Sequence, residues 1–286
     1  MNTQFWLVQA FNGISYGALL FLVGSGLSLI FGVMRIVNLS HGSYFLLGGY
    51  VALSVIWTTG SWALSLPLAA LSIAAVGLLM ERIFLRPLGF DPLRQVLLTV
   101  GFAFLFQQAA LDIWTGNNFD INPPEALTKT IVVGGLFLPL YRIFMIATAA
   151  AIGIGLWLIM EKTRMGAAVR ATVDDAQMAR GVGIDTSRIS MFIFALGAFL
   201  AALGGVIGGA FLGIYPGLDF EMLPIAFAVV IIGGMGSLGG AAIGALLVGL
   251  ADNFGKALFP EVSYFTLYAP MALILAVKPT GLFGRE

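Results

Sequence analysis

The segment Glu161–Arg188, EKTRMGAAVRATVDDAQMARGVGIDTSR, is the only long polar stretch in a chain that is otherwise strongly hydrophobic. It holds five of the fourteen Lys and Arg residues of the sequence. It lies between two hydrophobic segments, residues 143–160 and 189–211. Because charged side chains are costly in the lipid interior, this segment is expected to project into water between two membrane-spanning helices.

The composition supports the same fold class for the whole chain. Of its 286 residues, 59% are hydrophobic and only 10% are charged, and the mean hydropathy is +1.00. Soluble domains carry about 25% charged residues. We therefore expect an all-α, polytopic integral membrane protein that forms a single transmembrane domain over residues 1–286. The net charge of zero gives no indication of nucleic-acid binding, and the absence of cysteine excludes disulfides and thiol catalysis.

Hydropathy predicts about eight spanning helices, since about 20 apolar residues cross a bilayer. The candidate segments are residues 7–33, 43–57, 62–80, 95–114, 143–160, 190–211, 223–251 and 263–277. The N-terminus lacks the basic region and cleavage site of a signal peptide, so the first segment is expected to remain a membrane helix.

Two interruptions fall inside hydrophobic stretches, one in each half of the chain. They are residues 35–49, RIVNLSHGSYFLLGG, and residues 232–240, IGGMGSLGG. Interrupted helices in both halves are typical of transporters whose pathway lies near the middle of the membrane. We therefore expect discontinuous helices in each half.

The distribution of Lys and Arg predicts the orientation. Eleven of the fourteen fall on one side if segment 161–188 is cytoplasmic, which leaves only Lys129, Arg142 and Lys256 on the other side. The C-terminus is then cytoplasmic. The N-terminus is then external, as is the loop 116–139.

The cytoplasmic segment is expected to form two short helices, residues 165–173 and 174–180. Asp174 and Asp175 suit the start of the second helix, and glycines 181 and 183 suit its end. Such a unit could transmit force from a soluble partner. An ordinary solvated loop is the alternative interpretation.

The first interruption contains Asn38, Ser40, Gly42 and the only histidine, His41. These side chains either satisfy the broken backbone or line a translocation path. The second interruption contains Gly234, Gly236 and Ser237, for which close helix packing and a path are both open. The pattern G-x-G-x-x-G at 234–239 is not read as a nucleotide site, because it lies inside an apolar membrane segment.

The acidic residues lie almost entirely at predicted water boundaries, and Asp219 is among them. An ion-driven carrier usually buries a carboxylate in the membrane, so energy is expected from elsewhere. The sequence contains neither a P-loop nor a catalytic constellation, and no cofactor is expected. A stand-alone carrier or channel and a membrane enzyme or assembly factor remain as alternatives.

Several motifs resemble the permease subunits of branched-chain amino acid ABC transporters of the Liv type. The resemblance is carried by GSGLSL at 24–29, GVMR at 32–35, Asn38, His41 and Gly42, residues 164–184, residues 233–240 and PTGLFGR at 279–285. It covers nearly the whole chain and matches the shorter of the two permease types, since no long N-terminal extension is present.

The resemblance implies that residues 164–184 dock in a cleft of an ATPase subunit. The expected coupling residues are Arg164, Gly166, Arg170, Ala171, Asp174, Asp175, Ala179 and Gly183. It also implies a bacterial inner-membrane importer with a second permease subunit, two cytoplasmic ATPases and an external solute-binding protein. The implied substrates are branched-chain or related amino acids, with urea, short amides and aromatic acids as alternatives.

Overall fold

The computed structural model describes residues 3–89 and 91–284, and these residues are mostly helical. Its long helices are α1 (Thr3–Met34), α2 (His41–Thr59), α3 (Trp62–Met80), α4 (Pro92–Trp114), α5 (Leu140–Lys162), α8 (Thr186–Leu212) and α10 (Leu238–Leu258). Shorter helices are α6 (Arg164–Asp174), α7 (Ala176–Gly181), α9 (Leu218–Gly233) and α11 (Ser263–Val277). Residues 285–286, which include the Arg285 of the terminal motif, lie outside the described range.

Six of the described helices are long and apolar enough to cross a membrane, namely α1, α3, α4, α5, α8 and α10. This establishes a multi-pass membrane protein, but the expected count of about eight spans is not confirmed. Helices α9 and α11 have only 16 and 15 residues. Helix α2 carries histidine, serine and glycine residues that lower its hydropathy.

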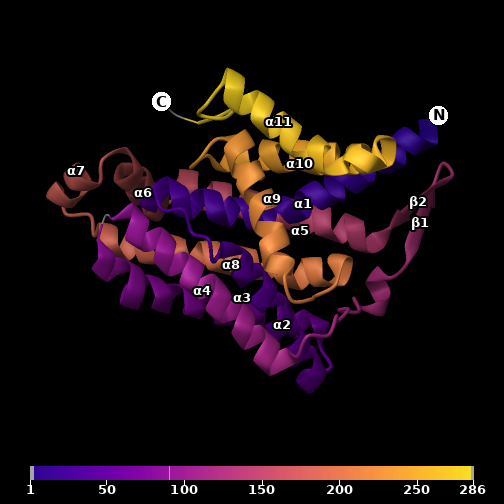
Figure 1. The fold of residues 1–286 in the computed structure, drawn as a ribbon, viewed down its shortest axis with the longest axis horizontal. Coiled ribbons are helices and arrows are strands. Elements are labelled where there is room, and N and C mark those ends of the chain that lie inside the picture. The colour runs from indigo at the N-terminus through magenta and orange to yellow at the C-terminus, as the bar shows by residue number, and fades with distance from the viewer. Residues whose placement is uncertain (1–2, 90, 285–286) are drawn as a thin grey trace.

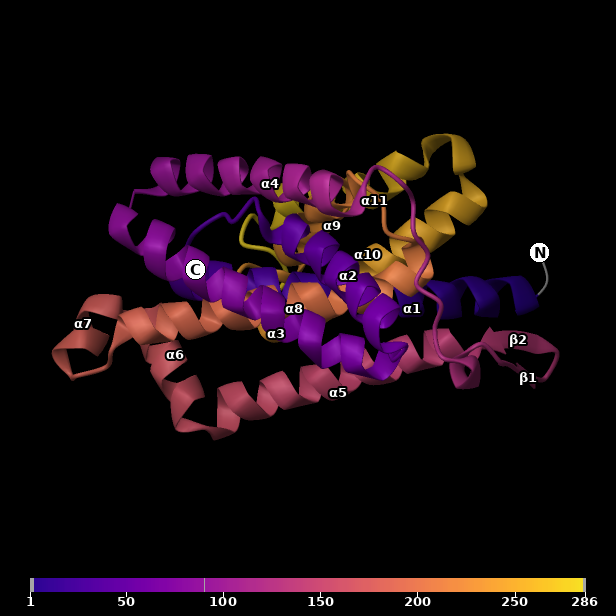
Figure 2. The ribbon, with the colours of Figure 1, turned by 90° about the horizontal axis from the view of Figure 1, so that it is seen from below.

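Helices α1 and α8 form the centre of the protein. In the most apolar part of α1, 78% of the residues are buried, against 17% in α5. Small residues permit this packing, since Gly26 of α1 lies against the main chain of Gly197 in α8. Helices α4 and α5 lie at opposite edges of the helix assembly (Figure 2).

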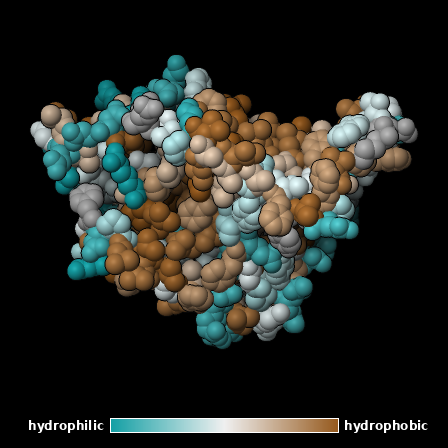
Figure 3. Space-filling model, turned by 45° about the horizontal axis from the view of Figure 1, so that its top comes forward, coloured by the Kyte–Doolittle hydropathy of each residue, from teal (hydrophilic) through white to brown (hydrophobic). Residues whose placement is uncertain are grey.

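The outer helices present apolar side chains away from the core, including Leu71, Leu97, Phe104 and Trp157. Hydrophobic residues cover the middle of one face, while hydrophilic residues gather toward the end where α6 and α7 lie (Figure 3). An exposed apolar surface of this kind fits a lipid environment.

Helices break within both predicted interruptions, but the first is shorter than the predicted residues 35–49, because residues 41–49 belong to α2. Helix α1 ends at Met34 and α2 begins at His41, while α9 ends at Gly233 and α10 begins at Leu238. Gly234 and Gly236 have φ angles of 101° and 80°, a conformation that favours glycine. Helices therefore break at these residues although the surrounding sequence is apolar.

The loop 116–139 departs from the all-α expectation. It contains an antiparallel hairpin of β1 (Thr130–Val133) and β2 (Leu136–Pro139), joined by Gly134 and Gly135. These glycines have φ angles of 57° and 83°, as tight hairpin turns require. The hairpin and the α6–α7 unit lie at opposite ends of the long axis of the protein (Figure 1).

Candidate functional site

The polar segment folds as the two expected short helices, and a side chain caps each of them. Thr163 Oγ1 accepts a hydrogen bond from the Gly166 amide of α6 at 3.2 Å. Asp175 Oδ1 accepts from the amides of Gln177 and Met178 in α7 at 2.8 and 2.9 Å. These two bonds lower the pKa of Asp175, because they stabilise its ionised form. Asp174 does not start the second helix but is the last residue of α6.

A left-handed turn closes α7 and returns the chain to α8. Gly183 has a φ of 89°, its amide donates to Arg180, and the next amide, of Ile184, donates to Ala179 at 2.9 Å. Open space surrounds Gly183, so this glycine is needed for the turn and not for close packing within the chain. Ala179 is buried beneath the turn.

The α6–α7 unit is anchored to the transmembrane helices through α6. Gly166 lies against the Met160 carbonyl at the end of α5, where no side chain would fit. Arg170 donates to the same carbonyl and lies 3.5 Å from the Glu161 carboxylate. Val169 packs in an apolar cluster with residues of α5 and α8, such as Leu156 and Ile193. The unit is therefore attached to both flanking membrane helices.

The tip of this unit exposes apolar side chains. Met178 is 67% exposed and Val182 is 72% exposed, while Ala179 between them is buried. Arg164 is exposed and Ala171 is partly buried. An apolar tip on a water-facing segment has the character of a contact surface for another protein.

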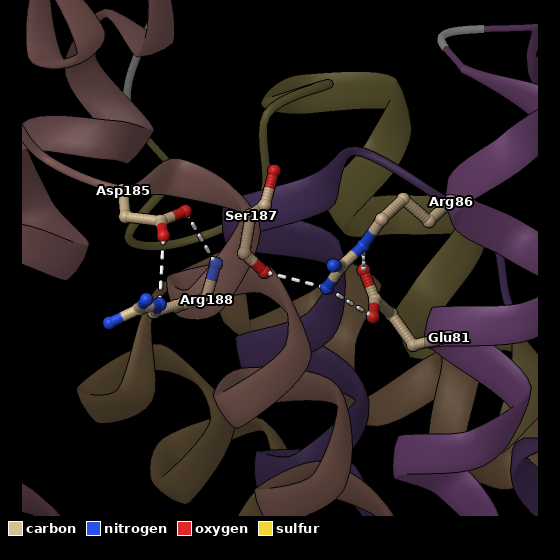
Figure 4. A network of polar contacts seen from close by, with 5 residues as sticks. All are labelled: Glu81, Arg86, Asp185, Ser187 and Arg188. Atoms are coloured by element: carbon tan, nitrogen blue, oxygen red, sulfur yellow. Dashed lines mark hydrogen bonds and ion pairs between the residues drawn. The ribbon is translucent and has the colours of Figure 1, made fainter.

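A polar network that the sequence did not predict joins α3 to the start of α8 (Figure 4). Arg86 pairs with the buried carboxylate of Glu81 at 2.9 Å and donates to the Ser187 carbonyl at 3.1 Å. Glu81 lies on a π-helical turn, Glu81–Leu85, which extends α3. Asp185 caps α8 by accepting from the Arg188 amide at 3.1 Å.

A cavity of about 180 Å³ lies beside this network. Residues from α7 and α8, including Arg180 and Ser190, line it together with Glu81 and Arg86. The cavity therefore lies between the α6–α7 unit, the start of α8 and the end of α3. The charged residues of ERIFLR at 81–86 are the sequence signal for this network. The pairing of Glu81 with Arg86 was not apparent from the sequence, because it depends on the π-helical turn.

The first set of predicted path residues is completely buried. Asn38 Oδ1 accepts from the Ser40 amide and hydroxyl at 3.1 and 2.7 Å, and His41 Nε2 donates to the Val23 carbonyl at 3.0 Å. Asn38 thus satisfies the backbone of the interruption at Ser40, while His41 joins the start of α2 to the interior of α1. Asn38 Nδ2 and His41 Nδ1 have no hydrogen-bond partner within the described part of the chain.

The second set lies near the end of α1. Ser237 caps α10 by accepting from the Gly240 amide at 3.0 Å, and Ser28 Oγ of α1 donates to the Ser237 carbonyl at 3.4 Å. Gly236 lies against Gly32, and Gly234 lies against Gly284. The two sets therefore contact different parts of α1 and do not converge on one point.

The expectation that Asp219 faces water is wrong. Its side chain is buried, and Ser43 Oγ of α2 donates to its Oδ2 at 3.0 Å. Gly42 lies against the main-chain carbonyl of the same residue. Sequence reasoning missed this site because Asp219 stands next to the loop residues Tyr215–Gly217, which look exposed.

Comparisons with known proteins identify relatives over nearly the whole chain. The family described as "Branched-chain amino acid transport system / permease component" matches residues 9–275. The high-affinity branched-chain amino acid transport system permease protein LivH of Escherichia coli is 31% identical, over 100% of this chain and 98% of the relative. The permease BraD of Pseudomonas aeruginosa is 29% identical, over 98% and 96%.

A second type of permease from the same transport systems is also similar. LivM of Salmonella typhimurium is 27% identical over 91% of this chain and 67% of the relative. No solved structure matches the chain significantly.

Proposed function

This chain belongs to the family of permease components of branched-chain amino acid transport systems, and from this premise we propose that it forms part of the translocation path of an ABC importer. Like its relatives, it is a transport subunit and not an enzyme. The proposed substrates are branched-chain or related amino acids, delivered by an external solute-binding protein.

The observation that carries the proposal is the construction of the α6–α7 unit. Its exposed tip, around Met178 and Val182, offers an apolar contact for an ATPase subunit. Its base is fixed to α5 by Gly166 and Arg170, and its apolar face packs on α8. Closure of two partner ATPases on ATP would displace the unit as a rigid body and move the attached helices.

Arg170 has a different place in this proposal from the one expected. Its guanidinium already contacts Met160 and Glu161 of the same chain, and its side chain is 39% exposed. The remaining exposed part can contact the ATPase. We propose that Arg170 holds the unit in position and also forms part of the contact surface.

The path is proposed to follow the buried polar side chains at the start of α2, between α1 and α9. Asn38, Ser40 and His41 supply polar groups there, and the interruption at residues 234–237 allows α9 and α10 to move separately. A second permease subunit is proposed to complete the path in a heterodimer, as the similarity to both LivH and LivM suggests.

The proposed location is the inner membrane of a bacterial cell. The N-terminus and the hairpin β1–β2 are external in this arrangement, and the C-terminus and the α6–α7 unit are cytoplasmic. The opposite placement of the hairpin and the α6–α7 unit along the protein supports this orientation.

Transport by the purified complex in liposomes tests the proposal. Uptake of L-leucine should require the partner ATPases, ATP inside and the solute-binding protein outside. Uptake without ATPases would instead indicate a stand-alone carrier or channel. Uptake of urea, acetamide or phenylalanine in preference to leucine would assign another substrate class.

The natural absence of cysteine permits a direct test of the path. Single cysteines at Asn38, His41 and Gly236 should react with a polar thiol reagent at rates that change when nucleotide is added. Labelling at none of these positions would show that the path lies elsewhere.

A further inference from the structure

The N-terminal turns of two helices, α2 and α9, meet at Asp219. Helix α9 starts one residue before it, and the first turn of α2 reaches it through Gly42 and Ser43. Helix N-termini carry partial positive charge, and together with the Ser43 hydroxyl they help to hold a carboxylate at this position. The side chain is only 2% exposed.

Asp219 differs from the other buried carboxylates of the described residues. Glu81 pairs with Arg86 at 2.9 Å, and Asp252 pairs with Lys256 at 2.7 Å. Asp219 has no basic partner among residues 3–89 and 91–284. A buried carboxylate without a cation is costly, and an ionisable residue inside the membrane commonly marks a functional site.

Two buried polar atoms near Asp219 lack hydrogen-bond partners in the described structure, one on Asp219 itself and one on Tyr50. Asp219 Oδ1 accepts no hydrogen bond in the described structure, and the fully buried hydroxyl of Tyr50 has no hydrogen-bond partner there either. Tyr50 lies two turns after Ser43, on the same face of α2, and side chains of a helix lean toward its N-terminus, so the Tyr50 hydroxyl extends toward the turn that holds Asp219. A ligand that donates hydrogen bonds and carries positive charge would satisfy both groups.

The site lies just inside the surface that the proposed orientation makes external. The loop before α9 pairs with the long external loop through Phe119 and Ile214. Tyr215 donates to Glu221 at 2.8 Å on the exposed side of the same turn of α9. Asp219 contacts Gly42 and Ser43, which directly follow His41, so a solute at Asp219 would lie beside the proposed path residues of α2.

We propose that Asp219 and Tyr50 form a binding site for a primary ammonium group, and that this group is the α-ammonium of the transported amino acid. The inference rests on the proposed function. The ammonium donates to Asp219 Oδ1 and to the Tyr50 hydroxyl, while Ser43 keeps the carboxylate in place. Because Gly42 and Asp219 are in close contact here, the first turns of α2 and α9 must separate when the solute binds.

Uptake of radiolabelled L-leucine by the complete transporter in liposomes tests this site. Asp219→Asn keeps the size of the side chain and an acceptor for Ser43 but removes the charge. We expect uptake to fall at least about tenfold while the ATPase activity stimulated by the binding protein stays within about twofold. Asp252→Asn, a buried carboxylate on α10 outside the site, should retain most of the uptake.

Analogues separate the ammonium from the rest of the substrate. 3-Methylbutylamine carries the amino group of leucine without its carboxylate, and 4-methylpentanoate carries the carboxylate without the amino group. The amine, and not the acid, should inhibit leucine uptake by the unmodified transporter through the permease. The Asp219→Asn variant should lose this inhibition.

A second variant keeps the test decisive if Asp219→Asn does not accumulate in the membrane. Tyr50→Phe removes only a hydroxyl that has no partner, and it should raise the half-saturating leucine concentration several-fold. The site would be overturned if Asp219→Asn showed unchanged uptake and unchanged inhibition by the amine. If only Tyr50→Phe folds, unchanged leucine kinetics in that variant would overturn it. A complex that imports no amino acid even without substitutions would instead overturn the proposed function.

Discussion

Gly166 of α6 lies against the main-chain carbonyl of Met160 in α5, with no space between them for a side chain. One turn later, Arg170 donates a hydrogen bond to the same carbonyl. Carbonyls at the end of a helix lack partners within that helix, so these contacts complete α5 as well as fixing α6. A displacement of α6 must therefore be carried into α5.

Substitution of Gly166 should separate the α6–α7 unit from α5. A methyl group in Gly166→Ala would overlap the Met160 carbonyl, and overpacking of this kind costs about 1–3 kcal/mol. We expect leucine uptake to fall strongly while the rest of the protein stays folded. Gly155→Ala on α5 is the matched control, because its added methyl group meets open space outside the contact surface. Equal uptake by the two variants would contradict the anchoring role.

Reversal of charge at Arg170 should abolish coupling. Arg170→Glu loses the bond to the Met160 carbonyl and places a second carboxylate beside that of Glu161. Uptake and stimulated ATPase activity should therefore both be lost. Glu161→Gln removes only a half-exposed ion pair, which contributes less than about 1 kcal/mol, and should leave uptake near normal. Normal uptake by Arg170→Glu in protein that reaches the membrane would remove this residue from the coupling site.

The ion pair between Glu81 and Arg86 should matter for stability more than an exposed pair does. Arg86→Ala leaves a buried carboxylate without its cation, and we expect a loss of about 1–3 kcal/mol in detergent, since Arg86 is itself partly exposed. Arg94→Ala breaks the exposed pair with Asp91 and should cost less than about 1 kcal/mol.

Removal of both charges provides the control for that prediction. The double variant Glu81→Gln, Arg86→Gln should recover much of the lost thermal stability, because no unpaired charge remains. A double variant as unstable as Arg86→Ala would show that the pair acts through packing alone.

The cap at Asp175 should make the stability of α7 depend on pH. Bonds from the amides of Met178 and Gln177 lower the pKa of Asp175 in the folded state. Its stabilising contribution is therefore complete above the unfolded pKa of about 4 and is lost as the pH falls through the lower folded value. Hydrogen exchange of α7, corrected for the intrinsic rate, should accelerate at acidic pH.

Two substitutions separate the effect of the negative charge of Asp175 from the effect of its capping hydrogen bonds. Asp175→Asn keeps an acceptor for the cap and should show little of this pH dependence, whereas Asp175→Ala should exchange quickly at every pH. The same pH response in Asp175→Asn as in the unmodified protein would assign the effect to another group.

Much of the architecture was predictable from local sequence. The acidic and glycine residues of segment 161–188 predicted two short helices with a turn after them. The interruptions at residues 35–40 and 234–237 followed from polar and glycine residues within apolar sequence. These features depend on local free energies of helix formation and lipid burial, which the sequence reports directly.

The contacts between distant segments were not predictable in the same way. Asp219 looked like a boundary residue because the loop before it is polar, yet packing against Gly42 and Ser43 buries it. The partner of Glu81 lies five residues away on a π-helical turn, which breaks the spacing of an ordinary helix. Helices α2 and α11, which correspond to the predicted spans 43–57 and 263–277, are not among the six described helices that are long and apolar enough to cross a membrane, so the number of spans differs from the count based on hydropathy.

In the proposed transporter, the tip of the α6–α7 unit receives the movement of an ATPase subunit. A single cysteine at Met178, which is 67% exposed in a chain without native cysteine, should cross-link to the partner ATPase in the assembled transporter. The cross-link should depend on nucleotide and should block leucine uptake, while a cysteine at Val132 of the hairpin should form no such cross-link. A freely transporting complex in which Met178→Cys never reaches the ATPase would contradict the account.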